Sequence, residues 1–424
     1  MPAVVPGTLQ WTALGLFGIA LLHTFSTPLF HRLAQRHPAH AGAWHLLGEV
    51  EAVFGFWAMV LMVAMFALAG RQAALGYLDS REFTEPMFVF AVMVIAASRP
   101  ILGVASHLVH AASAIMPLPR ALSLFFCVLA VVPLLGSLIT EPAAMTLAAM
   151  LLRDRFFAAG LSTRLKYASI GVLFVNVSIG GTLTSFAAPA VLMVAAKWGW
   201  DSTFMLQVFG WKAALAVMVN ALVLALLFRR ELAGLKRPAT PPAGEGRSIP
   251  WAVTVISLAF LFAVIVFAHH AEMYLGVLVF FLAFAQAYPR FQDRLILREA
   301  FLVAFFLAGL VVLGGQQQWW LQPLLLKMSA TEVYFGATLL TAVTDNAALT
   351  YLGSLVDGLS AEFKYSLVAG AVTGGGLTIV ANAPNPAGLS ILKEHLAGNA
   401  IHPLGLLLAA LPPTLVALAA FRLL

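Results

Sequence analysis

Residues 344–350 read TDNAALT, and residues 140–146 read TEPAAMT. Each heptapeptide lies in a long apolar stretch and places a carboxylate directly after a threonine. An ionisable side chain inside a membrane costs at least ~2.5–3.5 kcal/mol on insertion scales, so it is a functional candidate by default. Two such motifs in one chain indicate an internal repeat that carries an ion site in each copy.

The composition of the whole chain is that of a membrane protein. Hydrophobic residues make up 61% of the 424 residues and charged residues only 10%, which is too little charge to cover a soluble surface. Long apolar runs such as 213–228 and 253–268 predict helices, because barrel strands would alternate apolar and polar residues. The formal net charge of +6 fits basic cytoplasmic loops better than it fits a nucleic-acid partner.

The apolar stretches predict an all-α polytopic membrane protein with about ten transmembrane helices. Two further stretches are each interrupted by an acidic residue and by turn-forming residues, so we expect re-entrant hairpins at about 121–152 and 321–356. The predicted spans are residues 9–30, 48–69, 88–109, 167–196, 203–228, 251–268, 272–289, 299–316, 365–393 and 403–423.

A polar segment divides the chain into two halves of similar length. Residues 229–250 are rich in proline, glycine and basic residues, which is the composition of a linker. With this linker in the cytoplasm, most of the 24 Lys and Arg residues fall in cytoplasmic loops, as the positive-inside rule requires. Each half, 1–228 and 251–424, then contains an odd number of spans. We therefore predict two repeats of inverted topology, each with one hairpin.

A second pair of motifs recurs in the same order downstream of the first pair. Residues 180–189 read GGTLTSFAAP and residues 375–384 read GGLTIVANAP, each in the middle of a predicted span. A Gly-Gly pair weakens a helix and a proline removes a backbone donor, so both spans are predicted to break at the membrane midplane. Transporters use the free carbonyls and amides of such breaks to bind ions and substrates.

These motifs supply the candidate ion-binding groups. Oxygen ligands from carboxylate, hydroxyl and amide side chains suit a hard cation such as Na⁺. Because burial penalises a charged carboxylate, Glu141 and Asp345 can each hold a proton or a cation but not both favourably. We expect both to be sodium ligands and the exchanging groups of a cation/proton antiporter. The predicted binding residues are Thr140, Glu141, Gly180, Gly181, Thr182, Thr184, Ser185, Thr344, Asp345, Asn346, Gly375, Gly376, Thr378, Asn382 and Asn385.

The four motifs resemble those of the ion transporter superfamily, which includes NhaD-type Na⁺/H⁺ antiporters, arsenite-efflux permeases and sodium-coupled dicarboxylate carriers. Its members have inverted repeats, each with a re-entrant hairpin and a broken helix. The dicarboxylate carriers have Ser-Asn-Thr at the hairpin tips, whereas this chain has Thr140-Glu141-Pro142 and Thr344-Asp345-Asn346. Acidic tips would repel a dianion, so the chain is most similar to the bacterial Na⁺/H⁺ antiporter branch.

The resemblance implies a secondary active transporter that works by alternating access in the bacterial cytoplasmic (inner) membrane. It also implies a homodimeric scaffold, against which the hairpins and broken helices move. The expected partners are Na⁺, H⁺ and membrane lipid, with no cofactor, no nucleic acid and no enzymatic activity. The sequence has no GxxxxGK[ST] loop for nucleotides, and its single cysteine, Cys127, excludes a thiolate metal cluster.

Three alternatives concern the charged residues. A sodium- or proton-coupled transporter of carboxylates or inorganic anions would have the same fold, with Arg99 or Lys212 balancing the substrate charge. Asp345 would have a structural role if it capped the returning half of its hairpin. Glu141 would be explained structurally by a salt bridge to Arg99.

Two pairs of residues outside the motifs also permit more than one interpretation. His107 and His110 share a helix face, which allows a metal pair or a pH sensor, although solvated ends of a span explain them equally well. They are also the only hint of a lipid-modifying enzyme. Glu49 and Glu51 begin the second predicted span, where they either line a proton pathway or are ordinary acidic residues at a helix N-terminus.

Overall fold

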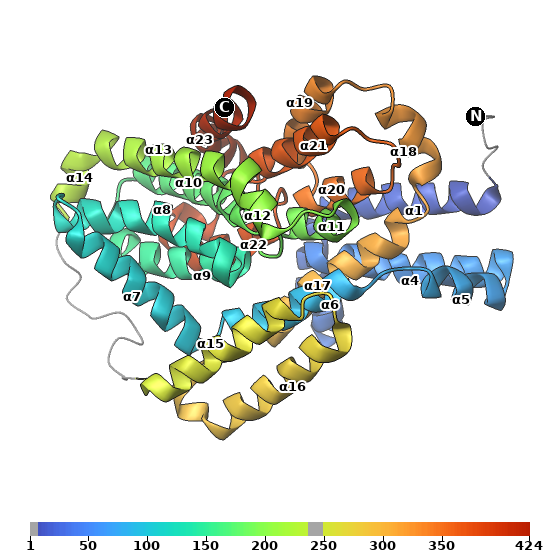
Figure 1. Cartoon of the computed structure of the whole chain (residues 1–424), viewed down its shortest axis with the longest axis horizontal. Coiled ribbons are helices and arrows are strands. Elements are labelled where there is room, and N and C mark those ends of the chain that lie inside the picture. The colour runs from blue at the N-terminus through green and yellow to red at the C-terminus, as the bar shows by residue number, and fades with distance from the viewer. Residues whose placement is uncertain (1–6, 236–248) are drawn as a thin grey trace.

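The computed structural model describes residues 7–235 and 249–424, and within these ranges every regular element is a helix (Figure 1). The predicted linker lies mostly outside the described residues. Its first part is described, where Arg229–Ala233 forms the short helix α14, and so are its last two residues, 249–250. The predicted all-α class is therefore confirmed for the described part of the chain.

Six described helical segments are long and apolar enough to cross a membrane. A seventh span results if α6 (Thr84–Ala96) and α7 (Arg99–Ile115) are counted together. The chain bends by 68° between these two helices. The chain is thus a multi-pass helical membrane protein. The six segments are α4 (Val50–Ala69), α8 (Arg120–Ile139), α10 with the 3₁₀ turn η3 (Thr163–Leu183), α12 to α13 (Ser202–Leu227), α17 (Leu297–Gly314) and α23 (Pro403–Leu423).

The predicted span 88–109 is not one straight helix. Ser98 between α6 and α7 has an extended backbone, with φ −67° and ψ 147°, and Pro100 lies in the first turn of α7. A proline is favourable in a first helical turn but cannot continue the helix before it, so the chain bends here. The shorter apolar helices are α11 (Pro189–Trp198), α15 (Trp251–Val266) and α16 (Ala271–Ala287).

The two acidic motifs each begin a short helix. In the first half, α8 turns back at Thr140 into α9 (Glu141–Leu152), and the two helices pack together as a hairpin. Thr140 has φ 75°, a left-handed conformation that reverses the chain at the tip. In the second half, α18 (Gln318–Leu325) and α19 (Ala330–Thr341) precede α20 (Asn346–Ser354).

The two Gly-Gly motifs interrupt helices, as the sequence predicts. Helix α10 ends at Gly180 and η3 (Gly181–Leu183), and the chain then runs without helix to α11. Helix α21 (Ala361–Gly374) ends directly before Gly375, and α22 (Pro384–Leu392) follows after a non-helical segment. Both second segments begin with a proline, which suits the first position of a helix.

The helices that follow the tips exchange partners between the two halves (Figure 1). Helix α9 of the first half packs against α22 of the second, and α20 of the second half packs against α11 of the first. Because of this exchange, both acidic tips and both helix breaks lie in one buried region.

A second group of helices lies beside this region. Helix α4 packs against α17 and against α1 (Thr8–Thr24), α17 also packs against α6, and α15 packs against α16. Helices α4 and α17 are in close backbone contact at Gly309, where an added Cβ would lie 2.3 Å from the backbone nitrogen of Gly55. This contact fixes the distance between the two helices.

Replacing Gly309 with alanine is therefore expected to destabilise the protein by about 1–3 kcal/mol, because backbone atoms of α4 would have to move. Thermal unfolding of the purified protein in detergent measures the effect. Gly276 in α16 is the matched control, since nothing lies within 4 Å of the position of its Cβ. Equal unfolding temperatures for Gly309→Ala and Gly276→Ala would contradict the close contact.

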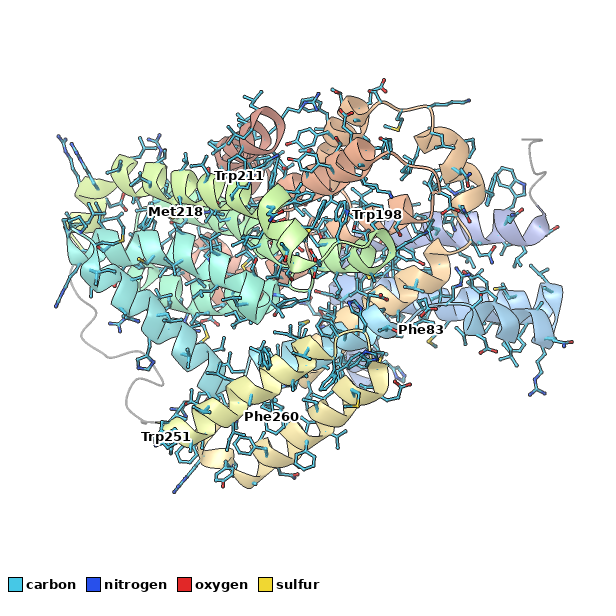
Figure 2. The ribbon with its side chains drawn as sticks, in the orientation of Figure 1. Phe83, Trp198, Trp211, Met218, Trp251 and Phe260 are labelled. Carbon is cyan, nitrogen blue, oxygen red and sulfur yellow. The ribbon has the colours of Figure 1, made fainter. Side chains whose placement is uncertain are left out.

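The outer surface of the described chain is apolar. Figure 2 labels Trp211, Met218 and Trp251, whose exposed fractions are 46%, 42% and 79%. Large apolar side chains at such exposure are unfavourable in water, and they are typical of a surface that contacts lipid. The surface therefore agrees with the position of α13 in one of the six segments that can cross a membrane.

Candidate functional site

Each acidic tip is bound to the helix break of its own half. The backbone N–H of Glu141, the first residue of α9, donates to the carbonyl of Ala187 at 3.4 Å. The backbone N–H of Asn346, the first residue of α20, donates to the carbonyl of Ala381 at 3.0 Å. The free groups of the two breaks are therefore used in part to hold the tips.

The first tip also contacts the break of the other half. Glu141 is only 1% exposed, and its Oε2 accepts a hydrogen bond of 2.9 Å from Nδ2 of Asn382. Gly181 lies against the same carboxylate, because an added Cβ would be 2.5 Å from Oε1 of Glu141. One buried carboxylate thus connects motifs that are about 240 residues apart in the chain.

The salt bridge between Glu141 and Arg99 is not formed, so that structural explanation of Glu141 is wrong. Nη1 of Arg99 instead lies 3.7 Å from Oδ1 of Asp293. Lys212 has a different partner as well, since its Nζ donates to the hydroxyl of Tyr365 at 2.9 Å. The carboxylate of Glu141 therefore has an amide partner and not a cationic one among the described residues.

Asp345 does cap the returning helix, as the structural alternative proposed. Its Oδ1 accepts hydrogen bonds from the backbone N–H groups of Ala347 at 2.8 Å and Ala348 at 3.3 Å. The backbone of Ala383, in the break of the same half, also interacts favourably with the charged carboxylate. These donors stabilise a negative charge, although Asp345 is only 9% exposed. Capping and ion binding are compatible, because a carboxylate has about four acceptor positions.

Four buried oxygens around the tips have no hydrogen-bond partner among the described residues. They are Oγ1 of Thr140 and the amide oxygens of Asn346, Asn382 and Asn385. A buried acceptor without a partner is unfavourable by about 1–3 kcal/mol. A bound cation would remove this cost for each oxygen that coordinated it.

The three asparagine side chains are held in place by their nitrogens. All three are at most 1% exposed, and each Nδ2 donates a hydrogen bond, which leaves the oxygen as the unused end of the amide. The acceptors are Oγ of Ser178 for Asn346 at 3.4 Å, Oε2 of Glu141 for Asn382 at 2.9 Å, and the carbonyls of Gly375 and Thr378 for Asn385 at 2.8 and 2.9 Å.

The threonine hydroxyl groups of the two breaks donate to backbone carbonyls, and the hydroxyl of Ser185 contacts another hydroxyl. They therefore stabilise the interrupted backbone, and only their lone pairs remain for a ligand. Ser185 contacts Ser202 of α12 at 3.2 Å. The hydroxyls of Thr182, Thr184 and Thr378 donate to the carbonyls of Ile179 at 2.7 Å, Ser137 at 2.7 Å and Ala342 at 2.9 Å.

Four residues of the predicted set remain to be placed, namely Thr344, Gly180, Gly375 and Gly376. Thr344 is half-buried and directly precedes Asp345. Three glycines permit close packing between elements: Gly180 contacts Pro133 of α8, Gly375 contacts Ser178 of α10, and Gly376 contacts Val175 of α10. At each of these positions glycine permits the close approach of a neighbouring helix.

A small cavity of about 20 Å³ lies beside Asp345. Its volume is sufficient for one water-sized particle. Its walls include Asp345 and Asn382, together with Val50 and Glu51 of α4 and Phe306 of α17. An ion in this cavity would therefore lie next to one acidic tip and next to Asn382.

Two residues near the site are missing from the set predicted from sequence. Ser178 accepts from Asn346 and donates to the carbonyl of Val372 at 2.7 Å, so it connects α10 with α21. Glu51 lines the cavity with Asp345. An acid in the first turn of an apolar span was a visible signal for Glu51, whereas an isolated serine in a span gave none.

The rings of His107 and His110 each form a hydrogen bond within their own helix. The Nδ1 atoms of His107 and His110 lie 2.6 and 2.8 Å from the carbonyls of Gly103 and Ser106, four residues earlier in the same helix. No group of three or more His, Cys, Asp or Glu residues in the described part of the chain could hold a metal ion. The metal pair and the lipid-modifying enzyme thus receive no support.

Membrane helices with interrupted segments around buried polar groups are typical of secondary transporters. A model of the protein family described as "Putative Na+/H+ antiporter" matches residues 8–424, which is nearly the whole chain. The chain belongs to this family, and it is therefore a transporter of the cation/proton antiporter type and not an enzyme. No curated protein matches the chain.

Proposed function

We propose that the chain exchanges Na⁺ for H⁺ by alternating access, with Glu141 and Asp345 as the groups at which the two ions compete. The observation that carries the proposal is the set of buried oxygens without partners on residues of the two tips and the second break, together with two buried carboxylates. Family membership supports the same pair of ions. A proton would neutralise a carboxylate directly, and Na⁺ would do so while it satisfies the neutral oxygens.

The amide orientations favour a cation over an anion. Each asparagine has its N–H groups directed at protein acceptors, so the oxygens of Asn346, Asn382 and Asn385 are the ends left for a ligand. Asn382 interacts with Glu141 and also lines the cavity beside Asp345. We infer that Asn382 couples the two carboxylates, so that binding of a proton or Na⁺ at one of them changes the affinity of the other.

The finer architecture is part of the proposal. We infer ten spans and two re-entrant hairpins in inverted repeats, as in NhaD-type antiporters, with residues 1–228 and 251–424 as the repeats and 229–250 as the cytoplasmic linker. The exchange of α9 and α20 between the halves supports one moving unit that contains both tips and both breaks. The other helices would form a homodimeric scaffold in the bacterial cytoplasmic membrane. Na⁺ and H⁺ are the cargo, and no cofactor is required.

The anion transporter receives less support from the structure. It needed Arg99 or Lys212 to balance the substrate charge, but Arg99 is paired with Asp293, and neither residue lines the cavity beside Asp345. Two buried carboxylates next to the proposed substrate would also repel an anion. We therefore retain cation exchange as the single proposed function.

The test is proton flux into or out of proteoliposomes that contain a pH-sensitive dye. Vesicles with the native protein are challenged with Na⁺, Li⁺, K⁺ and a series of dicarboxylates. Proton release on addition of Na⁺ or Li⁺, but not of dicarboxylates, is the expected result. Proton movement driven only by a dicarboxylate together with sodium would refute cation exchange and support the anion transporter.

A further inference from the structure

Glu51 is a third acidic side chain at the proposed ion site. It is the second residue of α4, and it lines the same cavity as Asp345 and Asn382. The cavity, at about 20 Å³, admits one water-sized particle. Any ion in it would therefore be close to both carboxylates at once.

The cavity lies between the two groups of helices. One wall is formed by Val50 and Glu51 of α4 and by Phe306 of α17, and these two helices pack extensively on each other. The opposite wall is formed by Asp345 at the second tip and by residues of the second break, including Asn382. A movement of one group relative to the other would thus separate Glu51 from Asp345.

The charges around Glu51 leave it available for a cation. Its neighbour Glu49 accepts a hydrogen bond of 2.8 Å from Nη2 of Arg298, in α17. Glu51 itself takes part in no ion pair among the described residues. The charged groups that act on it electrostatically are Glu49, Arg298 and Asp345.

We propose that Glu51 is a cation-binding carboxylate supplied by the scaffold, and that it completes the site only while Asp345 faces α4. The inference rests on the proposed cation exchange. Two carboxylates at one small cavity cannot both ionise without compensation, so the pair holds one proton when no cation is present. Entry of Na⁺ releases that proton to water, and the site keeps a net charge of −1 in both loaded forms.

This balance has a consequence for the transport cycle. The pair with one proton and the pair with one Na⁺ carry the same charge, so the surrounding dipoles do not have to reorganise during exchange. The empty, fully ionised pair is unfavourable because both charges face a cavity with apolar walls. Asp345 therefore leaves Glu51 only when it carries an ion, which prevents transport without exchange.

The experiment compares Glu51→Gln with Glu49→Gln in the proteoliposome assay, over a range of pH and Na⁺ concentration. Glutamine keeps the size of the side chain but cannot ionise. We expect Glu51→Gln to raise the Na⁺ concentration for half-maximal flux about tenfold or more and to flatten its dependence on pH. Glu49→Gln removes an exposed ion pair with Arg298, so its flux should stay within about twofold of the native value.

Two additional measurements distinguish a binding role of Glu51 from a structural one, and failure of this inference from failure of the proposed function. Glu51→Asp retains the charge and should restore most of the Na⁺ affinity, whereas a purely structural role would not be rescued in this way. The shift of the unfolding temperature by Na⁺ reports binding without transport, and Glu51→Gln should reduce that shift while Glu49→Gln should not. If the native protein exchanges ions and Glu51→Gln matches Glu49→Gln in both assays, the inference is wrong and the proposed function stands. If the native protein neither exchanges ions nor is stabilised by Na⁺, both are wrong.

Discussion

The substitution Asp345→Asn is expected to abolish Na⁺-driven proton release and to leave the unfolding temperature almost unchanged. Asparagine and aspartate are equally good at capping a helix, so the hydrogen bonds to Ala347 and Ala348 can persist. The amide cannot bind or release a proton, and it offers a cation a dipole where the carboxylate offers a charge. Flux should therefore fall to the level of empty vesicles in the dye assay.

The alanine variant separates the two roles of Asp345. Asp345→Ala removes the cap as well as the charge, so it should lose transport and also about 1 kcal/mol of stability. A protein with Asp345→Asn that still exchanges Na⁺ for protons at the native rate would show that Asp345 is only a cap. Exchange would then have to depend on Glu141 or Glu51.

The substitution Glu141→Gln should have an effect of similar size, for a related reason. Glutamine can still accept the hydrogen bond from Nδ2 of Asn382, so the link between the two halves is retained. What is lost is the charge that a proton or Na⁺ would neutralise. We expect flux near the background level, with normal expression and a normal unfolding temperature.

A second variant tests the same carboxylate without removing it. Gly181→Ala would place a Cβ about 2.5 Å from Oε1 of Glu141, so the carboxylate must move away from its present position. We expect a partial loss of flux and a weaker apparent affinity for Na⁺. Gly18→Ala is the matched control, because nothing lies within 4 Å of that Cβ position in α1.

Full activity of Glu141→Gln would contradict the role of Glu141 and indicate that only the second tip carries the ion.

Local sequence signals were sufficient for the positions of the two tips and the two breaks. Glycine pairs and prolines act on the backbone within one or two turns, so the ends of α10 and α21 and the starts of α11 and α22 follow from the residues present there. The bend at Ser98 had an equally local cause in Pro100, but the apolar run around it suggested an uninterrupted span. Hydropathy detects the length of a span and not its direction.

The contacts that make the site were beyond the reach of local signals. The hydrogen bond from Asn382 to Glu141 joins residues of different halves, and the cavity joins Glu51 to Asp345. Such pairs depend on how helices pack, which a single sequence does not encode in any short segment. The sequence also left two interpretations of Asp345 open, and the structure shows that it caps α20.

The exchange of α9 and α20 between the halves has a consequence for synthesis. Helix α9 is completed at Leu152, but its partner α22 begins only at Pro384, so a large part of the chain must be inserted before Glu141 meets Asn382. Until then the first tip has an ionisable side chain in an unfinished environment, and long-range contacts of this kind form slowly. The nascent first half is therefore the form of the protein most exposed to misassembly and to quality-control proteases. The extent of its degradation depends on how soon the last helices are synthesised and inserted.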